Sequence, residues 1–332
     1  MKIRLGIIGT GIAAKELHLP ALMGLEDKFE IVCVCNHTEP KAKEFSELIG
    51  NVPYYLDYRD LLTRKDVDAV DVILPIQLNC KVVLDSLEAG KHVIVEKPIA
   101  SNLDDAAFMA TFPDRFDTVM MVAENYRYNP VFKRVKELMS GGRIGEPYSV
   151  FWDQLTVMDD TNKYARTQWR IDHQYPGGFV MDAGIHNIAV LRDLFGEMKS
   201  GIAYNRSVNP AIGRMDSMSL QFEFESGVNG SLDMYFSAQG MSKNELTILG
   251  SEGTIVVQGN VLTVKLRGNE EIREVIETDR GYGGQFEDLY ESIANHKSPV
   301  STFQEAFKDF KTMVLALDSA MKWEGLSFAD SI

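Results

Sequence analysis

A lysine directly follows a short apolar strand in this chain, at a position where packing alone does not explain its charge. Residues 92–95 predict a buried strand, and Glu96, Lys97 and Pro98 come immediately after it. Burying an ammonium group is costly unless another group makes use of it. Because Pro98 biases Lys97 toward extended backbone, the fold sets the direction of the lysine side chain. We therefore identify Lys97 as a candidate catalytic residue.

An aspartate and a histidine four residues apart, Asp182 and His186, form a second candidate pair. Gly177 and Gly178 predict a sharp turn that leads into a helix, and residues four apart share one helical face. A carboxylate beside an imidazole holds its tautomer and raises its basicity, which suits proton transfer at a hydroxyl group. The alternative is an aspartate that stabilises the helix dipole beside a core histidine. The presence of Lys97, and of a glycine-rich loop at residues 9–14, favours the catalytic interpretation.

Upstream of this pair, Trp169 and Arg170 place a planar cation that could meet a phosphate or a substrate carboxylate. A surface ion pair is the alternative for Arg170.

The glycine loop lies at the start of the chain, between a strand and a helix. Residues 5–8 predict a buried strand, and the pattern Gly-x-Gly-x-x-Ala follows it, with Gly9, Gly11, Ile12 and Ala14. In this fingerprint the first glycine permits the turn, the second lets the backbone approach a pyrophosphate, and the third small residue keeps helix and strand close. The helix N-terminus offers free N–H groups to the phosphates. The segment therefore predicts dinucleotide binding.

The end of the second predicted strand should read the adenosine ribose. An acidic residue there selects NAD, because it repels the 2′-phosphate of NADP. This chain has Asn36 and His37 instead, with no acid before Glu39. The missing carboxylate favours NADP mildly, and both residues are candidate ribose or phosphate contacts. The alternative is that Asn36 is a turn residue and His37 merely exposed.

Strands and helices alternate through the first third of the chain, which predicts an α/β domain, a Rossmann doubly wound parallel sheet, over residues 1–124. Ligands of such sheets bind at the carboxyl ends of the strands. The residues that follow those ends are further candidates for the nicotinamide half of the cofactor site: Leu74, Pro75, Glu96, Lys97 and Asn125.

From residue 125 to 332 the pattern changes to many strands with alternating polar and apolar residues, as in residues 220–225. This period predicts an α+β domain with a large, mainly antiparallel open sheet that has one covered face. A single chain covers the other face poorly, so we expect a homodimer or homotetramer built by contact between sheets.

The composition is that of an ordinary globular protein of 332 residues. Net charge is −14, which argues against nucleic-acid and anionic-membrane partners, and no apolar run is long enough for a membrane span. Cys33, Cys35 and Cys80 lie in apolar segments, which favours free thiols over a disulfide or a metal site. We expect a cytoplasmic location, since the first predicted strand leaves no room for a signal peptide.

Taken together, these motifs resemble the Gfo/Idh/MocA family of oxidoreductases, nearly from end to end. The motifs that carry the resemblance are the glycine loop, residues 89–93 leading into Glu96-Lys97-Pro98, the segment Asn125-Tyr126-Arg127-Tyr128-Asn129-Pro130, Trp169-Arg170, and the Gly177-Gly178…Asp182…His186 cluster. The resemblance implies that Lys97 contacts substrate and nicotinamide, Asp182 orients the substrate, and His186 transfers the proton. It implies NAD(P)-dependent hydride transfer at a secondary hydroxyl or carbonyl of a sugar, polyol or related small molecule.

The chain departs from the family at residue 79, where Asn79 replaces a customary histidine near the ribose. Two other functions share this fold. One is a regulatory protein that binds the dinucleotide without turnover, which would need no lysine, aspartate and histidine together. The other is glycoside cleavage with a tightly held NAD, which the sequence leaves open.

Overall fold

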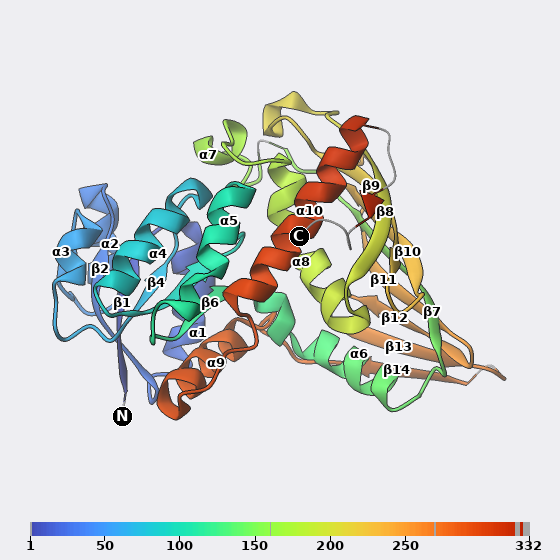
Figure 1. The fold of residues 1–332 in the computed structure, drawn as a ribbon, viewed down its shortest axis with the longest axis horizontal. Helices are drawn as coiled ribbons and strands as arrows, with labels where there is room; N and C mark the ends of the chain where they lie inside the picture. Colours follow the sequence, from blue (N-terminus) through green and yellow to red (C-terminus); the bar gives the residue numbers. More distant parts are fainter. Residues whose placement is uncertain (1, 160, 269, 323–325, 328–332) are drawn as a thin grey trace. The chain divides into compact units, whose positions relative to one another are not determined.

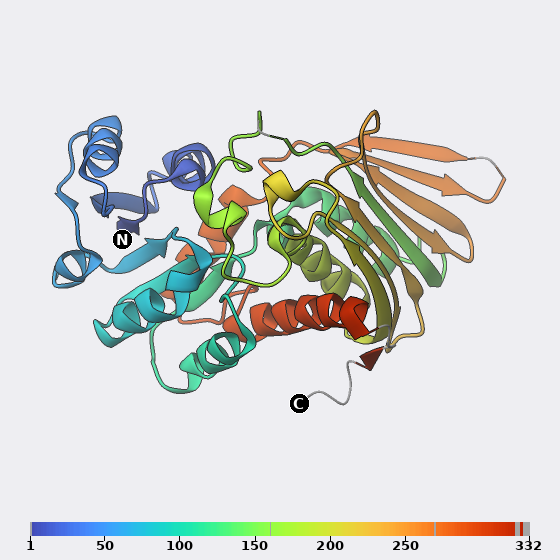
Figure 2. The same cartoon turned by 90° about the horizontal axis from the view of Figure 1, so that it is seen from above.

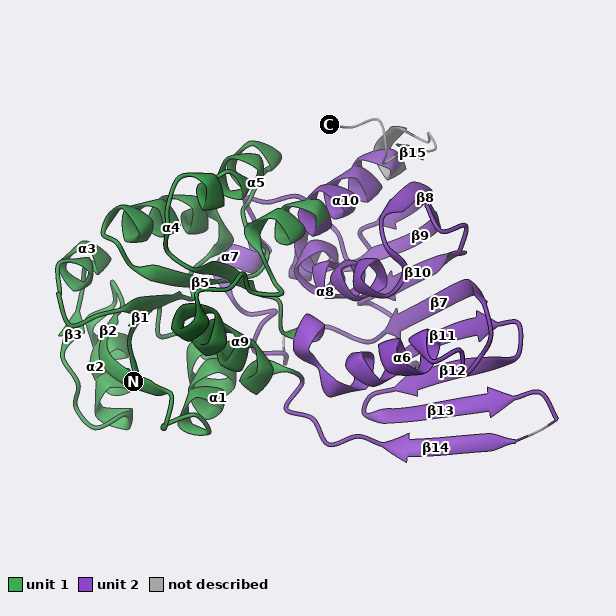
Figure 3. Ribbon diagram, turned by 60° about the horizontal axis from the view of Figure 1, so that its bottom comes forward, with its two compact units in different colours: residues 1–125, 281–308 green, residues 126–280, 309–332 purple. Residues whose placement is uncertain are grey.

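The computed structural model describes residues 2–159, 161–268, 270–322 and 326–327. The chain divides into two compact units (Figure 3), each built from two segments of sequence. Unit 1 comprises Met1–Asn125 and Gly281–Lys308, and unit 2 comprises Tyr126–Arg280 and Asp309–Ile332.

Unit 1 contains the predicted parallel sheet. Its six strands lie in the order β3-β2-β1-β4-β5-β6, and all described pairings are parallel. The central strands β1, β4 and β5 are buried on both faces over most of their length, as expected for a sheet that helices cover on either side. The strands are β1 (Ile3–Ile8), β2 (Phe29–Cys35), β3 (Tyr54–Tyr55), β4 (Ala69–Val72), β5 (His92–Glu96) and β6 (Met120–Ala123).

Helical segments connect these strands (Figure 1). They are η1 (Ala14–His18), α1 (Leu19–Met23), α2 (Glu39–Leu48), α3 (Tyr58–Leu62), η2 (Ile76–Leu78), α4 (Asn79–Glu88), α5 (Leu103–Ala110) and η3 (Phe112–Asp114). The sequence predicts one uninterrupted helix after the glycine loop. The structure instead contains a π-helical turn, η1, which leads directly into α1. A π turn re-aims the side chains that follow it, and such turns are frequent at functional sites.

The compact units differ from the predicted division at residue 124 in one segment. Residues 281–308, which contain α9 (Tyr282–Asn295), group with unit 1 although the sequence predicts that they continue the second domain. Aromatic packing explains the difference. The Phe286 ring lies 5.9 Å from that of Phe29, and the Phe303 ring lies 6.4 Å from that of Phe112. Sequence order alone does not reveal such long-range contacts.

Unit 2 is built on a nine-stranded sheet in the order β14-β13-β12-β11-β7-β10-β9-β8-β15. The pairing of β7 with β10 is parallel, and the other described pairings are antiparallel. The strands are β7 (Pro147–Leu155), β8 (Met198–Arg206), β9 (Ser217–Phe224), β10 (Asn229–Tyr235), β11 (Lys243–Gly250), β12 (Gly253–Gln258), β13 (Val261–Leu266), β14 (Glu271–Val275) and β15 (Leu326–Ser327).

Three long helices, α6, α8 and α10, lie along one face of this sheet, as Figure 2 shows. The helical segments here are η4 (Asn125–Tyr128), α6 (Pro130–Ser140), α7 (Gln168–Ile171), α8 (Gly178–Phe195), η5 (Pro210–Ile212) and α10 (Phe303–Lys322), which begins in unit 1. Helix α8 begins at Gly178, directly at the predicted glycine turn. Among the described residues, no helix is long and apolar enough to cross a bilayer.

Candidate functional site

The first glycine of the loop occupies a position that only glycine tolerates. Gly9 has φ +106°, and a Cβ built on it would lie 2.0 Å from the carbonyl oxygen of Ile73 and 3.2 Å from Leu74. Its N–H donates to the Cys35 carbonyl at 2.9 Å. The turn at Gly9 is therefore pressed against the carboxyl ends of β2 and β4, and it brings the predicted site residues Gly9 and Leu74 together.

The second glycine differs in kind. A Cβ on Gly11 would meet no described atom within 4 Å, and the residue has no positive φ. Gly11 is exposed, Ile12 is half-buried and Ala14 is fully buried beneath the helix. Within unit 1, the described residues therefore leave free the space beside Gly11. Open space above a helix start fits a pyrophosphate, because the first N–H groups of the helix face it.

The ribose-side candidates lie at the end of β2. The side chain of Asn36 donates to Thr10 Oγ1 at 3.0 Å and accepts from the Thr38 N–H at 2.9 Å. Asn36 thus ties the glycine loop to the turn after β2, which matches the turn-residue alternative. His37 is exposed at this corner, and so is Lys41.

Asn79 is placed differently from a ligand contact. Its side chain is fully buried, and its amide donates to the carbonyl oxygens of Glu96 and Pro98, both at 3.0 Å. The amide nitrogen thus binds the backbone around Lys97, whereas Oδ1 of Asn79 is buried without a hydrogen-bond partner among the described residues. Pro75 precedes this segment and is half-buried at the end of β4.

The lysine segment follows β5 as predicted. Lys97 is half-buried, and Asn125 is buried where β6 leads into η4. The Glu96 side chain points inward, with Oε1 2.7 Å from Nε2 of His18. Glu96 is therefore bonded inside unit 1 rather than directed at a cofactor, a placement that the sequence does not reveal.

In unit 2 an arginine holds the predicted aspartate. The Nε of Arg170 donates to Oδ2 of Asp182 at 2.8 Å, and the two side chains are only 15% and 13% exposed. The Arg170 guanidinium also lies 4.0 Å from the centre of the Trp169 ring. Arg170 thus forms a mostly buried ion pair instead of the surface pair considered from sequence. This pair favours the ionised form of Asp182.

His186 stacks on an aromatic ring. The rings of His186 and Tyr126 are 4.5 Å apart and nearly parallel, at 17°. This stacking sets the plane of the imidazole, and the ring nitrogens point outward within that plane. The expected support of His186 by Asp182, one turn earlier on α8, remains a prediction.

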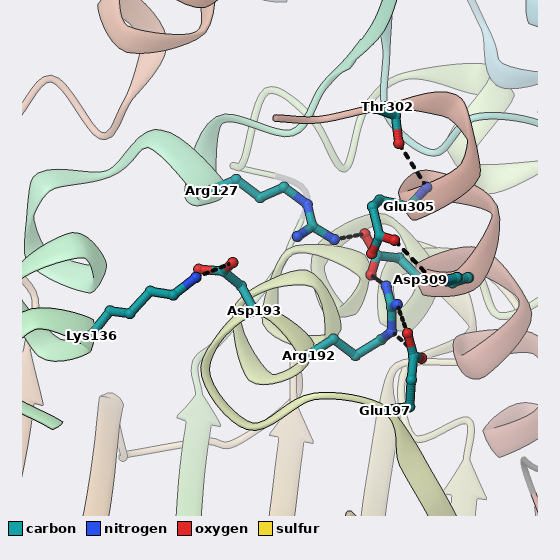
Figure 4. A network of polar contacts seen from close by, with 9 residues as sticks. Arg127, Lys136, Arg192, Asp193, Glu197, Thr302, Glu305 and Asp309 are labelled. Carbon is teal, nitrogen blue, oxygen red and sulfur yellow. Dashed lines mark hydrogen bonds and ion pairs between the residues drawn. The ribbon is translucent and has the colours of Figure 1, made fainter. Parts of the chain in front are cut away.

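A buried ion network anchors the segments that carry Tyr126 and His186 (Figure 4). Arg127, next to Tyr126, donates to Asp309 of α10 at 2.6 Å. Arg192 of α8 bonds the other oxygen of Asp309 and also binds Glu197 at 2.6 Å. All of these side chains except Glu197 are less than 5% exposed. The network joins η4, α8 and α10, and so keeps the stacked rings in register.

Sequence reasoning missed two residues of this region, Tyr126 and Tyr175. Tyr175 is buried, and its ring lies 5.9 Å from that of Trp169. Burial raises the pKa of its phenol, and the charge of Asp182 raises it further. The position of Tyr126 just after a strand end was the available signal, whereas nothing in the sequence around Tyr175 indicates its neighbours.

The candidates thus form two groups. Lys97 and the glycine loop belong to unit 1, whereas Asp182 and His186 belong to unit 2.

Two family models match the chain. Residues 3–124 match "Oxidoreductase family, NAD-binding Rossmann fold", and residues 136–324 match "Oxidoreductase family, C-terminal alpha/beta domain".

Individual proteins are similar over most of the chain. A crystal structure of an oxidoreductase from Thermotoga maritima has a TM-score of 0.94 and 34% identity, with 100% of both chains covered. An uncharacterised protein of Saccharomyces cerevisiae is 32% identical, covering 88% of each chain. A myo-inositol 2-dehydrogenase of Thermotoga maritima is 26% identical, covering 76% of this chain and 74% of its own.

Proposed function

Because the chain belongs to the Gfo/Idh/MocA oxidoreductase family, whose N-terminal domain is an NAD-binding Rossmann fold, we propose that it oxidises or reduces a sugar-like small molecule. The bond made or broken is the C–H of a secondary alcohol. The observation that carries this proposal is the Arg170–Asp182 pair, one helical turn before His186. The name of the myo-inositol 2-dehydrogenase relative supports a polyol or sugar as substrate.

Each proposed catalytic residue has a separate role. A nicotinamide coenzyme, when bound, accepts or supplies the hydride. His186, held in plane by Tyr126, takes the hydroxyl proton during oxidation and returns it during reduction. Lys97 polarises the substrate oxygen with its ammonium group. Asp182, ionised beside Arg170, accepts a hydrogen bond from a substrate hydroxyl and so orients the substrate.

The cradle for the coenzyme phosphates is the loop Gly9–Ala14, supported by the open space beside Gly11. We assign a preference for NADP over NAD. The end of β2 carries no carboxylate to repel a 2′-phosphate, and the exposed His37 and Lys41 lie near it in sequence. Titrating NADPH and NADH fluorescence tests the preference. Tighter NADH binding would contradict it, and a Lys41→Gln variant should weaken NADPH binding more than NADH binding.

We further propose a homodimer or homotetramer formed through the large sheet. The sheet face opposite α8 carries the exposed Phe151, flanked by Ser231 and Thr247 on the neighbouring strands. The three cysteines are free thiols, which supports a reducing, cytoplasmic setting.

A panel of sugars, polyols and their oxidised forms, followed by absorbance of the reduced nicotinamide, tests the reaction. We expect turnover with release of free reduced coenzyme, and this release separates the reaction from glycoside cleavage with a retained coenzyme. Lys97→Ala and His186→Ala should each abolish most turnover in a folded protein. Near-normal turnover in both variants would refute these roles.

A further inference from the structure

A histidine buried in unit 1 bridges two carboxylates next to the proposed catalytic lysine. The His18 side chain is 0% exposed, with Nδ1 2.8 Å from Oδ2 of Asp71 and Nε2 2.7 Å from Oε1 of Glu96. Asp71 is also 0% exposed, and Glu96 is 14% exposed. A histidine cannot make two such bonds to ionised carboxylates unless both ring nitrogens carry protons, because a carboxylate only accepts. His18 is therefore an imidazolium wherever Asp71 and Glu96 are both ionised.

The charges around His18 support this protonation state. Burial alone would lower the pKa of His18, but the carboxylates of Asp71 and Glu96 outweigh burial and raise that pKa to about 10. The other ring neighbours come from α9. Phe286 lies edge-on at 5.4 Å, and Tyr282 is tilted at 6.1 Å. Both rings pack against the imidazole, and the phenol of Tyr282 is the titratable group that they bring to it.

Three elements of unit 1 meet at this imidazole. His18 ends the π turn η1 that follows the glycine loop, Asp71 lies in the middle of the buried strand β4, and Glu96 ends β5. Among the described residues, Asp71 Oδ1 has no hydrogen-bond partner, so His18 supplies the described hydrogen bond to that carboxylate. Asp71 therefore holds the imidazole, and the imidazole holds Glu96.

The consequence falls on Lys97. Asn79 binds the carbonyl oxygens of Glu96 and Pro98, and His18 binds the Glu96 side chain. The backbone of Lys97 is thus held in two ways. Asn79 binds the main-chain carbonyl oxygens of the residues on either side of it, and His18 binds the side chain of the residue before it. In addition, the Glu96 carboxylate binds the imidazole of His18, and this contact competes with an ion pair between Glu96 and the ammonium group of Lys97.

We propose that His18 is a positioning residue for Lys97: with Asp71 behind it, its imidazole draws the Glu96 carboxylate into the domain and so fixes the segment that carries the lysine. This rests on the proposed function insofar as Lys97 is catalytic. Removing His18 leaves two carboxylates facing each other and frees Glu96 to pair with Lys97. Loss of the His18 cation and approach of the Glu96 carboxylate both favour the charged form of Lys97.

The test measures the titration of Lys97 without requiring turnover. Competitive labelling with acetic anhydride, followed by mass spectrometry of the peptide containing Lys97, gives its reactivity as a function of pH. In His18→Gln we expect the midpoint to rise by about one pH unit. The matched control is His92→Gln. His92 lies at the opposite end of the same strand, and its Nδ1 accepts from the Val119 N–H at 2.9 Å. This control should leave the Lys97 midpoint unchanged.

Kinetics with the working substrate supply the second measurement. We expect His18→Gln to lower kcat about tenfold or more while coenzyme affinity changes little, because the variant alters the reacting lysine and not the glycine loop. An unchanged Lys97 midpoint in folded His18→Gln would overturn the proposal. If instead the wild type turns over no sugar while His18→Gln still shifts Lys97, the proposed function fails and the positioning role stands.

The double variant His18→Gln/Glu96→Gln covers the case in which His18→Gln does not fold. It removes one of the two carboxylates, so that Asp71 and Glu96 no longer repel each other. It is compared with Glu96→Gln alone. If His18 acts through Glu96, removing it from the Glu96→Gln protein leaves kcat unchanged and raises the Lys97 midpoint by less than His18→Gln does in the wild type, because only the loss of the cation remains. A further fall in kcat, or an equally large rise of the midpoint, would contradict the proposal.

Discussion

Arg170 and Asp182 form an ion pair across twelve residues of sequence, with Nε of the arginine 2.8 Å from Oδ2 of the aspartate. Arg170 lies on α7, and Asp182 lies one turn before His186 on α8, the helix that the two left-handed glycines Gly177 and Gly178 introduce. Gly177 has φ +81°, a conformation that favours glycine, and a Cβ there would also lie 2.5 Å from the side chain of Leu317 in α10. The turn at Gly177 and Gly178 therefore sets where α8 begins, and this start fixes the position of Asp182 along the helix.

The first prediction concerns this pair. Asp182→Asn keeps the shape of the side chain but removes the charge that orients the substrate, and we expect kcat to fall about 10²-fold or more. Arg170→Gln should lower kcat/KM about tenfold, and Arg170→Lys should recover only part of the loss because lysine lacks the planar fork. Steady-state kinetics on the active substrate give these values. Thermal unfolding checks that the variants are folded, and full activity of Asp182→Asn would exclude the assigned role.

The second prediction separates the two loop glycines. Gly9→Ala places a Cβ 2.0 Å from the Ile73 carbonyl oxygen at a positive φ, so we expect a loss of stability greater than about 1 kcal/mol. In Gly11→Ala the added Cβ meets no atom of the residues that the structure describes within 4 Å, so its stability should be close to wild type. Its coenzyme Kd should nevertheless rise at least tenfold, about 1.4 kcal/mol, because the methyl group occupies the space of the pyrophosphate. Urea unfolding and coenzyme fluorescence titration measure the two effects, and unchanged coenzyme affinity in Gly11→Ala would count against the cradle.

The third prediction is a pH dependence of stability from His18. Its pKa is raised from 6.5 to about 10 on folding, so the native state binds one more proton than the unfolded chain between these values. This contribution is fully present below pH 6.5 and is lost as the pH rises toward 10, with a slope of at most about 1.4 kcal/mol per pH unit. We expect the difference in unfolding free energy between wild type and His18→Gln to shrink over that window. Denaturant unfolding at a series of pH values measures it, and a difference that grew with pH would have the wrong sign.

The fourth prediction uses the buried network of Figure 4. Asp309→Asn leaves Arg127 and Arg192 without their shared carboxylate, and we expect a loss of about 3–5 kcal/mol in unfolding free energy. Asp193, in the more exposed pair with Lys136, provides the matched control. Asp193→Asn should change stability by about 0.5 kcal/mol or less. Equal effects of the two substitutions would show that the buried network does not anchor η4 and α8.

The fifth prediction addresses assembly. Phe151→Glu places a charge in the centre of the open sheet face, where Phe151 is 40% exposed. A charge buried without a partner at an interface is unfavourable, so the variant should sediment as a monomer at concentrations where the wild type is oligomeric. Analytical ultracentrifugation at micromolar protein measures this. A wild type that sediments only as a single chain would remove the basis of the proposal.

Local sequence determined much of this protein. The glycine loop and the alternation of strands and helices identify the first domain, because turn chemistry and hydrophobic period act over a few residues. The two-residue period likewise indicates the large sheet. The spacing of Asp182 and His186 places them on one helix, and Glu96-Lys97-Pro98 marks the end of a strand, since both depend only on near neighbours.

The tertiary structure alone decided which groups those residues meet. Arg170 holds Asp182 in a mostly buried ion pair, Tyr126 stacks on His186, and Asp71 and Glu96 both bond to His18. Each partner comes from another element, and such pairings depend on how helices and strands pack rather than on the propensity of either segment. The π turn at His18 and the return of residues 281–308 to the first unit have the same origin. Packing of distant aromatic and charged side chains overrides what the local pattern prescribes.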